Sequence, residues 1–250
     1  MTLDEYRKIA AKFKVTGSDY ILDFFINCSG KSGSMTLTES FKALNKRAMH
    51  IHGNKALRHH MGPIKYKVND IIDFCSFHKK VYVIDVYRNP IERKISAIFQ
   101  GFNPVSTIAK IQACSNDELI KYVNDNFLQT DEYNSFEEWS INMYDYPFDH
   151  DTGYKVVTKD NITYILLKFD RINDWENQIN SILNTMDFKL VNKNLTKDKI
   201  IYPQYEFIKK NWAIPPEFVQ YIHTNDRWKR VMQYFMTEDE YINYFKKYKD

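Results

Sequence analysis

The chain has 250 residues, a formal net charge of +3, and 44% hydrophobic and 16% aromatic residues. It is long enough for one substantial α/β core, and so mild a charge gives no reason to expect a nucleic-acid partner. No apolar run approaches the roughly 18 residues of a membrane helix, and the first residues lack the features of a signal peptide.

The first predicted elements are a helix, a buried strand, a loop and a second helix. Residues 3–14 place apolar side chains on one helical face that can pack on a sheet. Residues 20–27, YILDFFIN, form a nearly continuous apolar run, which is typical of a strand covered on both faces. The loop CSGKSGSMT, residues 28–36, follows, and apolar residues then recur at helical spacing from Met35 to Leu44.

The loop at residues 28–36 has the composition of a phosphate-binding segment. Gly30 and Gly33 permit the positive φ values and the close backbone approach that a tight phosphate loop needs. Backbone N–H groups at the start of the following helix bind anions, and Lys31 adds a mobile positive charge. Three hydroxyl groups can assist them, those of Ser32, Ser34 and Thr36.

Two other interpretations of this loop exist. A nucleoside triphosphate P-loop needs its first glycine five residues before Gly30, and Phe25 stands there, so we reject a standard Walker A motif. The second is a flexible turn without a ligand, because short glycine- and serine-rich motifs also arise by chance.

A short strand is predicted over residues 47–52, RAMHIH, and it carries the candidate general base. His50 and His52 point to the same face of such a strand. A histidine with its ordinary pKa of about 6.5 accepts a proton near neutral pH, and His52 is favoured because it stands nearer the strand end. His59 and His60 form a second candidate pair, and the spacing of these histidines matches no zinc pattern, so no metal is predicted.

A second anion site is predicted in residues 81–96, VYVIDVYRNPIERKIS, where a buried strand passes into a helix. Arg88 stands at the carboxyl end of the strand, where open α/β sheets bind ligands. Asn89 can cap the helix and Pro90 suits its first position. Ser96 follows eight residues after Arg88, and helical side chains lean towards the N-terminus, so both can reach one phosphate. The alternative is an arginine paired to a carboxylate and a serine bonded to its own helix.

The rest of the chain is predicted to be mainly helical, with residues 154–169 forming two strands around a turn at residues 159–161. Residues 100–115 are less regular and are a candidate contributor to an acceptor cleft. Further helices are predicted over residues 69–77, 117–128 and 136–144. Two capping boxes are predicted, Ser135 with Glu138 and Thr237 with Glu240. Five large aromatic residues are assigned to the core: Phe24, Phe25, Trp139, Trp175 and Phe245.

The segments KSGSMT, residues 31–36, and RNPIERKIS, residues 88–96, together resemble the nucleotide motifs of sulfotransferases that use 3′-phosphoadenosine 5′-phosphosulfate. The first is similar to their 5′-phosphosulfate loop, often K-[SG]-G-T-[TR], although Ser34 replaces the usual threonine and Met35 a polar or cationic residue. The second is similar to their 3′-phosphate motif and is closest to carbohydrate sulfotransferases of the heparan-sulfate type. Residues 164–175 look like a late strand-to-helix segment of the family, and residues 234–245 look like its last helix.

This resemblance implies a donor and a role for each site residue. The sulfate and the 5′-phosphate would be held by Lys31, Ser32, Gly33, Ser34 and Thr36. Arg88 and Ser96 would hold the 3′-phosphate. Family members place a His or Glu near the end of their second strand, so His52 or His50 would remove the acceptor proton while Lys31 stabilises the departing phosphate, with no metal.

We therefore predict one α/β domain over residues 1–250, with a three-layer, P-loop-like fold, a central parallel sheet and a helical C-terminal region. The predicted function is sulfuryl transfer from 3′-phosphoadenosine 5′-phosphosulfate to a hydroxyl group of a carbohydrate, leaving 3′-phosphoadenosine 5′-phosphate. The alternatives are a nucleotide-dependent phosphotransferase with an aberrant P-loop and a noncatalytic nucleotide- or glycan-binding module. The individual acceptor and the oligomeric state are left open.

The cysteines favour a cytoplasmic location. Cys28, Cys75 and Cys114 are too few and too scattered for a disulfide framework, so we expect reduced thiols. Golgi carbohydrate sulfotransferases normally carry a membrane anchor. This chain is therefore expected to be a soluble bacterial or viral relative, or a chain from which an anchor has been removed.

Overall fold

The computed structural model describes residues 1–15, 21–100, 104–127, 135–191 and 200–246. The chain divides into two compact units, each made of two segments. The first unit contains Met1–Tyr87 and Tyr133–Lys193, and the second contains Arg88–Glu132 and Asn194–Asp250. Each unit has its own hydrophobic core.

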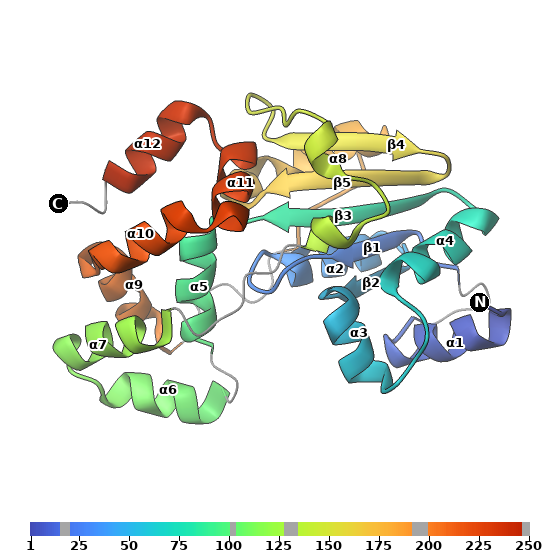
Figure 1. Ribbon diagram of the computed structural model, residues 1–250. Coiled ribbons are helices and arrows are strands. Elements are labelled where there is room, and N and C mark those ends of the chain that lie inside the picture. The colour runs from blue at the N-terminus through green and yellow to red at the C-terminus, as the bar shows by residue number, and fades with distance from the viewer. Residues whose placement is uncertain (16–20, 101–103, 128–134, 192–199, 247–250) are drawn as a thin grey trace. The chain divides into compact units, whose positions relative to one another are not determined.

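The first unit is built around a five-stranded, mostly parallel sheet (Figure 1). Its strands are β1 (Phe24–Asn27), β2 (Ala48–Ile51), β3 (Val81–Tyr87), β4 (Tyr154–Lys159) and β5 (Ile162–Lys168). They lie in the order β2-β1-β3-β5-β4, with β4 antiparallel to β5 and the other neighbours parallel. The predicted central parallel sheet is confirmed, as are the two later strands with their turn.

Helices α2 (Ser34–Ala43) and α8 (Trp175–Leu183) cover one face of this sheet. Their apolar side chains share a core with alternate residues of the strands, among them Phe24 and Ile26 of β1. Residues of opposite parity face the other side, where the carboxylate of Asp85 accepts a hydrogen bond from the backbone N–H of Phe136 at 2.7 Å. The first unit is therefore compatible with a three-layer α/β arrangement.

Helices α1 (Leu3–Lys12), α3 (Gly53–Met61) and α4 (Val68–His78) complete this unit. Tyr6 of α1 stacks on Phe74 of α4 with ring centroids 4.8 Å apart, and its hydroxyl oxygen accepts a hydrogen bond from the backbone N–H of Leu22 at 3.2 Å. Helix α4 matches the helix predicted over residues 69–77.

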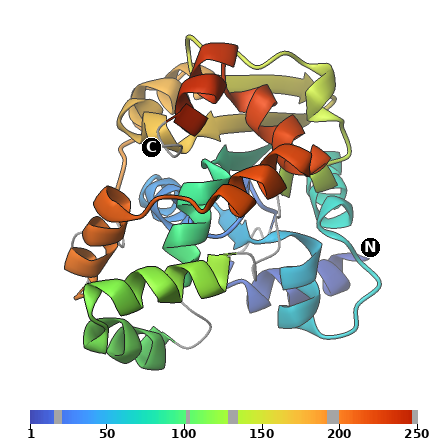
Figure 2. The same ribbon diagram turned by 60° about the vertical axis from the view of Figure 1, so that its left-hand side comes forward.

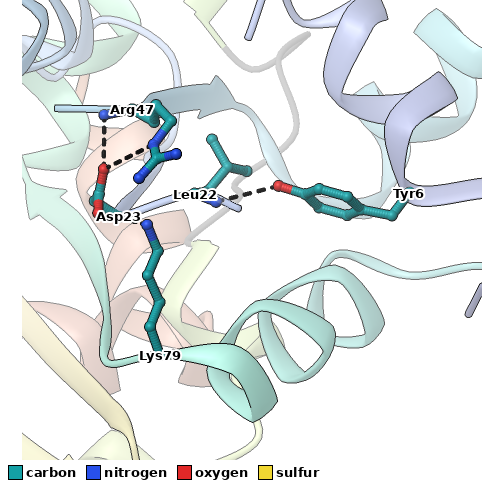
Figure 3. A network of polar contacts seen from close by, with 5 residues as sticks. All are labelled: Tyr6, Leu22, Asp23, Arg47 and Lys79. Atoms are coloured by element: carbon teal, nitrogen blue, oxygen red, sulfur yellow. Dashed lines mark hydrogen bonds and ion pairs between the residues drawn. The ribbon is translucent and has the colours of Figure 1, made fainter. Parts of the chain in front are cut away.

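The amino ends of the strands are joined by Asp23, which precedes β1 (Figure 3). One carboxylate oxygen accepts the backbone N–H of Arg47 at 2.9 Å, and the other accepts from Lys79 Nζ at 2.6 Å. Burial acts to raise the pKa of Asp23, but the hydrogen bonds from Lys79 and Arg47 and their charges outweigh it and lower the pKa. A charged Asp23 thus ties together the segments that lead into β1, β2 and β3.

The order of the strands places a topological switch point between β1 and β3. The chain leaves β1 for β2 on one side of it, and it later leaves β3 for β5 on the other side. In open α/β sheets, ligands bind outside the carboxyl ends of the strands at such a point. The loop at residues 28–33 follows β1 at this edge.

The second unit is helical and includes the predicted helical C-terminal region (Figure 2). Its helices are α5 (Pro90–Ile98), α6 (Pro104–Ala113), α7 (Asn116–Phe127), α9 (Tyr202–Asn211), α10 (Pro216–Thr224), α11 (Asp226–Phe235) and α12 (Glu238–Lys246). Their core combines residues from both chain segments, and Trp212 Nε1 of α9 donates to Asn124 Oδ1 of α7 at 2.8 Å.

Several local predictions were wrong. Residues 104–113 form the regular helix α6, although an irregular segment was expected. Residues 135–145 contain two short 3-10 helices, η1 (Ser135–Glu138) and η2 (Met143–Asp145), instead of one α-helix. The capping box of Ser135 and Glu138 does not form, because Glu138 accepts the backbone N–H of Asn54 at 2.9 Å instead.

Other local predictions are confirmed. Thr237 and Glu240 exchange two hydrogen bonds at the start of α12, as a capping box requires. The five aromatic residues assigned to the core are all buried. The first strand is shorter than expected, since β1 begins at Phe24, and Tyr20 and Leu128 lie outside the described residues.

Candidate functional site

The loop after β1 has a left-handed backbone at two positions. Lys31 has a φ of 68° and Gly33 a φ of 81°. Lys31 is the unexpected one, because a side chain makes this conformation costly. Gly30, which we expected to need a positive φ, lies outside the left-handed region. The turn is therefore made by Lys31 and Gly33.

Gly33 is the N-cap residue of α2. Since glycine has no side chain, it offers no oxygen to the first N–H groups of the helix, and α2 begins without a side-chain cap. A Cβ at this position would lie 2.9 Å from Cη2 of Trp175 and 3.3 Å from Cε2 of Phe169. Glycine is thus required here both by φ and by the close approach of the aromatic rings that follow β5.

The aromatic side of the loop is held by a backbone contact. Trp175 is fully buried, and its Nε1–H donates to the carbonyl oxygen of Lys168, the last residue of β5, at 2.9 Å. The loop after β1 therefore rests on a tryptophan that is itself fastened to the end of β5.

The hydroxyl groups predicted to bind the anion differ in their availability. Ser32 is fully buried and donates to the carbonyl of Ser29 at 2.6 Å, so its hydrogen closes the loop. Ser34 and Thr36 are each 5% exposed in the first turn of α2. Lys31 is half-buried, whereas Met35 is exposed.

His52 lies beside this loop and is bonded to it. Strand β2 ends at Ile51, so His52 is the N-cap residue of α3 and not a strand residue as predicted. Its Nδ1 lies 2.6 Å from the carbonyl oxygen of Cys28, the first residue of the loop. A carbonyl can only accept, so Nδ1 carries the hydrogen and Nε2 keeps its lone pair.

A second hydrogen bond joins the residues next to Cys28 and His52, namely Asn27 and Gly53. Gly53 has a φ of 70°, and its backbone N–H donates to Oδ1 of Asn27 at 3.0 Å. Two consecutive residues at the end of β1, Asn27 and Cys28, thus hold two consecutive residues at the start of α3. This fixes the position of His52 relative to the loop backbone.

The electrostatic environment keeps His52 neutral. Burial lowers its pKa, and the charge of His60 acts in the same direction, while the hydrogen bond to Cys28 acts to raise the pKa. Burial, together with repulsion between the charged forms of His50 and His52 and the charge of Lys42, lowers the pKa of His50 to about 4. The imidazole rings of His50 and His52 lie edge to face with centroids 4.5 Å apart. Near neutral pH the pair is therefore uncharged, and His52 Nε2 can accept a proton.

His50 is less suited to act on a substrate. Its Nε2 is buried and has no hydrogen-bond partner among the described residues. His59 and His60, the second candidate pair, are exposed on α3. Of the four candidate histidines, His52 is the one bonded to the loop.

Cys28 does not supply a nucleophile. Its thiol is fully buried, and burial together with the charge of Asp85 raises its pKa well above the ordinary value. The three cysteines of the chain form no disulfide. Within the described ranges, no group of three or more His, Cys, Asp or Glu side chains could hold a metal ion, and no helix there is long and apolar enough to cross a membrane.

The second predicted anion motif spans both units: its strand, β3, belongs to the first unit, and Arg88 and Ser96 belong to the second. Asn89 caps α5 by accepting the backbone N–H of Ile91 at 3.0 Å, and Pro90 takes the first helical position, as predicted. Arg88 is half-buried, and its Nη2 donates to the hydroxyl of Tyr205 at 3.2 Å. Ser96 is buried on α5.

Several residues that shape these sites were missed. The polar Asn27 at the end of an apolar strand was a signal in the sequence, because a buried amide there needs partners. The contact of Gly33 with Trp175 and the contact of Arg88 with Tyr205 join residues more than 100 positions apart, and no local pattern indicates them.

Comparison with known proteins gives no relative for this chain: no family model matches it, and no curated protein and no solved structure shows a match.

Proposed function

We propose that this protein transfers a sulfuryl group from 3′-phosphoadenosine 5′-phosphosulfate to a hydroxyl group of a carbohydrate. One observation carries the proposal: the imidazole of His52 is bonded to the carbonyl of Cys28, at the start of the candidate anion loop. The proton acceptor, His52, is thereby fixed at the carboxyl end of β1, next to the loop that leads to the N–H groups of α2. Transfer between a hydroxyl and a phosphosulfate needs both.

The loop and α2 supply the anion-binding part, in a P-loop-like arrangement. The first turn of α2, which receives no side-chain cap from Gly33, attracts the sulfate and the 5′-phosphate through its N–H groups, and Lys31 adds a positive charge. Ser34 and Thr36 stand in the same turn. Ser32 contributes by closing the loop through its bond to Ser29.

When bound, the nucleotide supplies the sulfuryl group and a bisphosphate leaving group. Nε2 of His52 takes the proton of the acceptor hydroxyl as its oxygen forms a bond to sulfur. The bond from sulfur to the 5′-phosphate oxygen breaks, and Lys31 with the loop N–H groups neutralises the charge on that oxygen. His52 Nδ1–H stays bonded to Cys28, which keeps the imidazole in the reactive tautomer.

The 3′-phosphate is assigned to Arg88 and Ser96. This part of the proposal depends on the sequence motif that surrounds them, and it is supported by the confirmed cap at Asn89 and by the placement of Ser96 two turns along α5. His50 is assigned a packing role against His52.

Two other functions compete with this proposal. A nucleotide-dependent phosphotransferase would use the same loop for ATP, but Phe25 lies within β1 where the first P-loop glycine belongs. A noncatalytic nucleotide- or glycan-binding module would keep the anion loop without turnover. Magnesium-dependent ATP hydrolysis supports the first, and nucleotide binding without transfer to any hydroxyl acceptor supports the second.

Calorimetric binding of 3′-phosphoadenosine 5′-phosphate, AMP, ADP and ATP tests the proposal. A charge-assisted hydrogen bond contributes about 1.5–3 kcal/mol, so the bisphosphate should bind at least about tenfold more tightly than AMP. Equal affinities for the bisphosphate and AMP would reject the proposed donor. Transfer of labelled sulfate from the donor to a mixture of glycans then tests the chemistry.

A further inference from the structure

Two tyrosine hydroxyls from the C-terminal helices contact the residues that follow β3. Arg88 Nη2 donates to the hydroxyl of Tyr205 on α9 at 3.2 Å. The hydroxyl of Tyr244 on α12 donates to Oδ1 of Asn89 at 2.8 Å. All four residues belong to the second unit. The two contacts differ in the direction of the hydrogen bond, and this difference separates their roles.

The Tyr205 hydroxyl has a hydrogen that none of the described residues accepts. Its oxygen accepts from Arg88, so its own hydrogen is directed elsewhere, and it has no acceptor among the described residues. The residue is only 6% exposed, and its ring packs edge to face on Phe99 with centroids 5.4 Å apart. A buried hydroxyl whose hydrogen lacks an acceptor is costly, which favours a ligand oxygen as the partner.

The surroundings of this hydroxyl favour an anion. The guanidinium of Arg88 is directly bonded to it, and Nζ of Lys209, one turn further along α9, lies 5.8 Å from the centre of the Tyr205 ring. An oxygen that accepts from a guanidinium becomes a stronger donor, because the two hydrogen bonds polarise each other. A phosphate oxygen can therefore accept from Arg88 and from Tyr205 together.

The Tyr244 hydroxyl is different. It donates its hydrogen to the side-chain oxygen of Asn89, which also caps α5. Tyr244 thus supports the start of the helix and has no hydrogen left for a phosphate.

We propose that Tyr205 is a further ligand of the 3′-phosphate and positions Arg88 for the same group. This inference rests on the proposed function, since it names an additional residue for the donor nucleotide. It also gives α9, which the sequence motifs did not include, a part in donor recognition.

The test compares 3′-phosphoadenosine 5′-phosphate with 5′-AMP, which lacks the 3′-phosphate, by calorimetry on the full chain. Tyr205→Phe removes the hydroxyl and keeps the ring against Phe99. We expect the bisphosphate to bind about tenfold or more weakly to this variant, because a charge-assisted hydrogen bond is lost, while the affinity for 5′-AMP changes by less than about twofold. Tyr221→Phe, which alters an exposed tyrosine of α10, is the matched control and should leave both affinities unchanged.

The outcomes separate the two proposals. If the wild-type chain prefers the bisphosphate and Tyr205→Phe keeps the full preference, Tyr205 is not a ligand and this inference is overturned alone. If the wild-type chain binds both nucleotides equally, the proposed function fails and this inference with it. Equal loss of both nucleotides in Tyr205→Phe would indicate a structural effect and also overturn the inference. Thermal unfolding of each variant without nucleotide confirms that it is folded.

Discussion

Gly33→Ala should destabilise the protein strongly, because two independent costs meet at this position. The residue has a φ of 81°, and a left-handed backbone costs a residue with a Cβ about 1–2 kcal/mol. The new Cβ would also lie 2.9 Å from Trp175, which is buried and fastened to the carbonyl of Lys168 and so cannot turn away freely. Overpacking of this kind typically costs about 1–3 kcal/mol.

The sum for Gly33→Ala is about 2–5 kcal/mol, which lowers the melting temperature of a chain of this length by about 4–20 °C. Circular dichroism during heating measures the shift. Gly30→Ala is the control, since no atom lies within 4 Å of its added Cβ and its φ is outside the left-handed region. If Gly33→Ala has the same melting temperature as Gly30→Ala, the packing of Trp175 against the loop is refuted.

Four further results are expected. Lys31→Ala should lower turnover by about 10²–10³ and weaken nucleotide binding less, because its charge acts on the leaving phosphate; a near-normal rate excludes this role. His52→Ala should reduce turnover by about 10² or more with bisphosphate affinity nearly unchanged, and a larger loss in His50→Ala would move the base there. The pKa of His50 is lowered to about 4, so as pH falls the unfolded chain binds a proton at this residue before the folded chain does. Wild-type stability should therefore fall as pH drops from about 6.5 to 4. In chemical denaturation, His50→Gln should show a weaker dependence of stability on pH over this range. Asp23→Asn should lower the free energy of unfolding by about 1–3 kcal/mol at neutral pH. Because the pKa of Asp23 is lowered in the folded chain, the extra stability of the wild type should be present above about pH 4 and should disappear as pH falls through the folded-state pKa. A stability difference that stays constant across this range would contradict the ion pairs.

The sequence predicted the parts of the fold that depend on short-range patterns. The buried strand predicted before Arg88 is β3 (Val81–Tyr87), and Asn89 and Pro90 begin α5 as expected. These patterns work because burial on both faces and capping are properties of neighbouring residues. The capping box at Ser135 failed for the opposite reason: Glu138 is used by Asn54, 84 positions away.

The same division holds for the candidate site. The loop could be located from its glycines, but the sequence could not show that Lys31 adopts the left-handed backbone instead of Gly30. His52 was selected for standing near a strand end, whereas its position is set by the carbonyl of Cys28, a backbone atom that no residue pattern reports.

The chain path also affects how the protein can be made. Strands β3 and β5 are neighbours in the sheet, yet residues 88–132, which belong to the other unit, are synthesised between them. Until residue 168 has left the ribosome, one edge of β3 lacks its native partner and exposes backbone groups that can pair with another chain. The second unit in turn needs residues 194–250. Neither unit can therefore be obtained intact by cutting the chain once, and chains that stop early should aggregate before either core has closed.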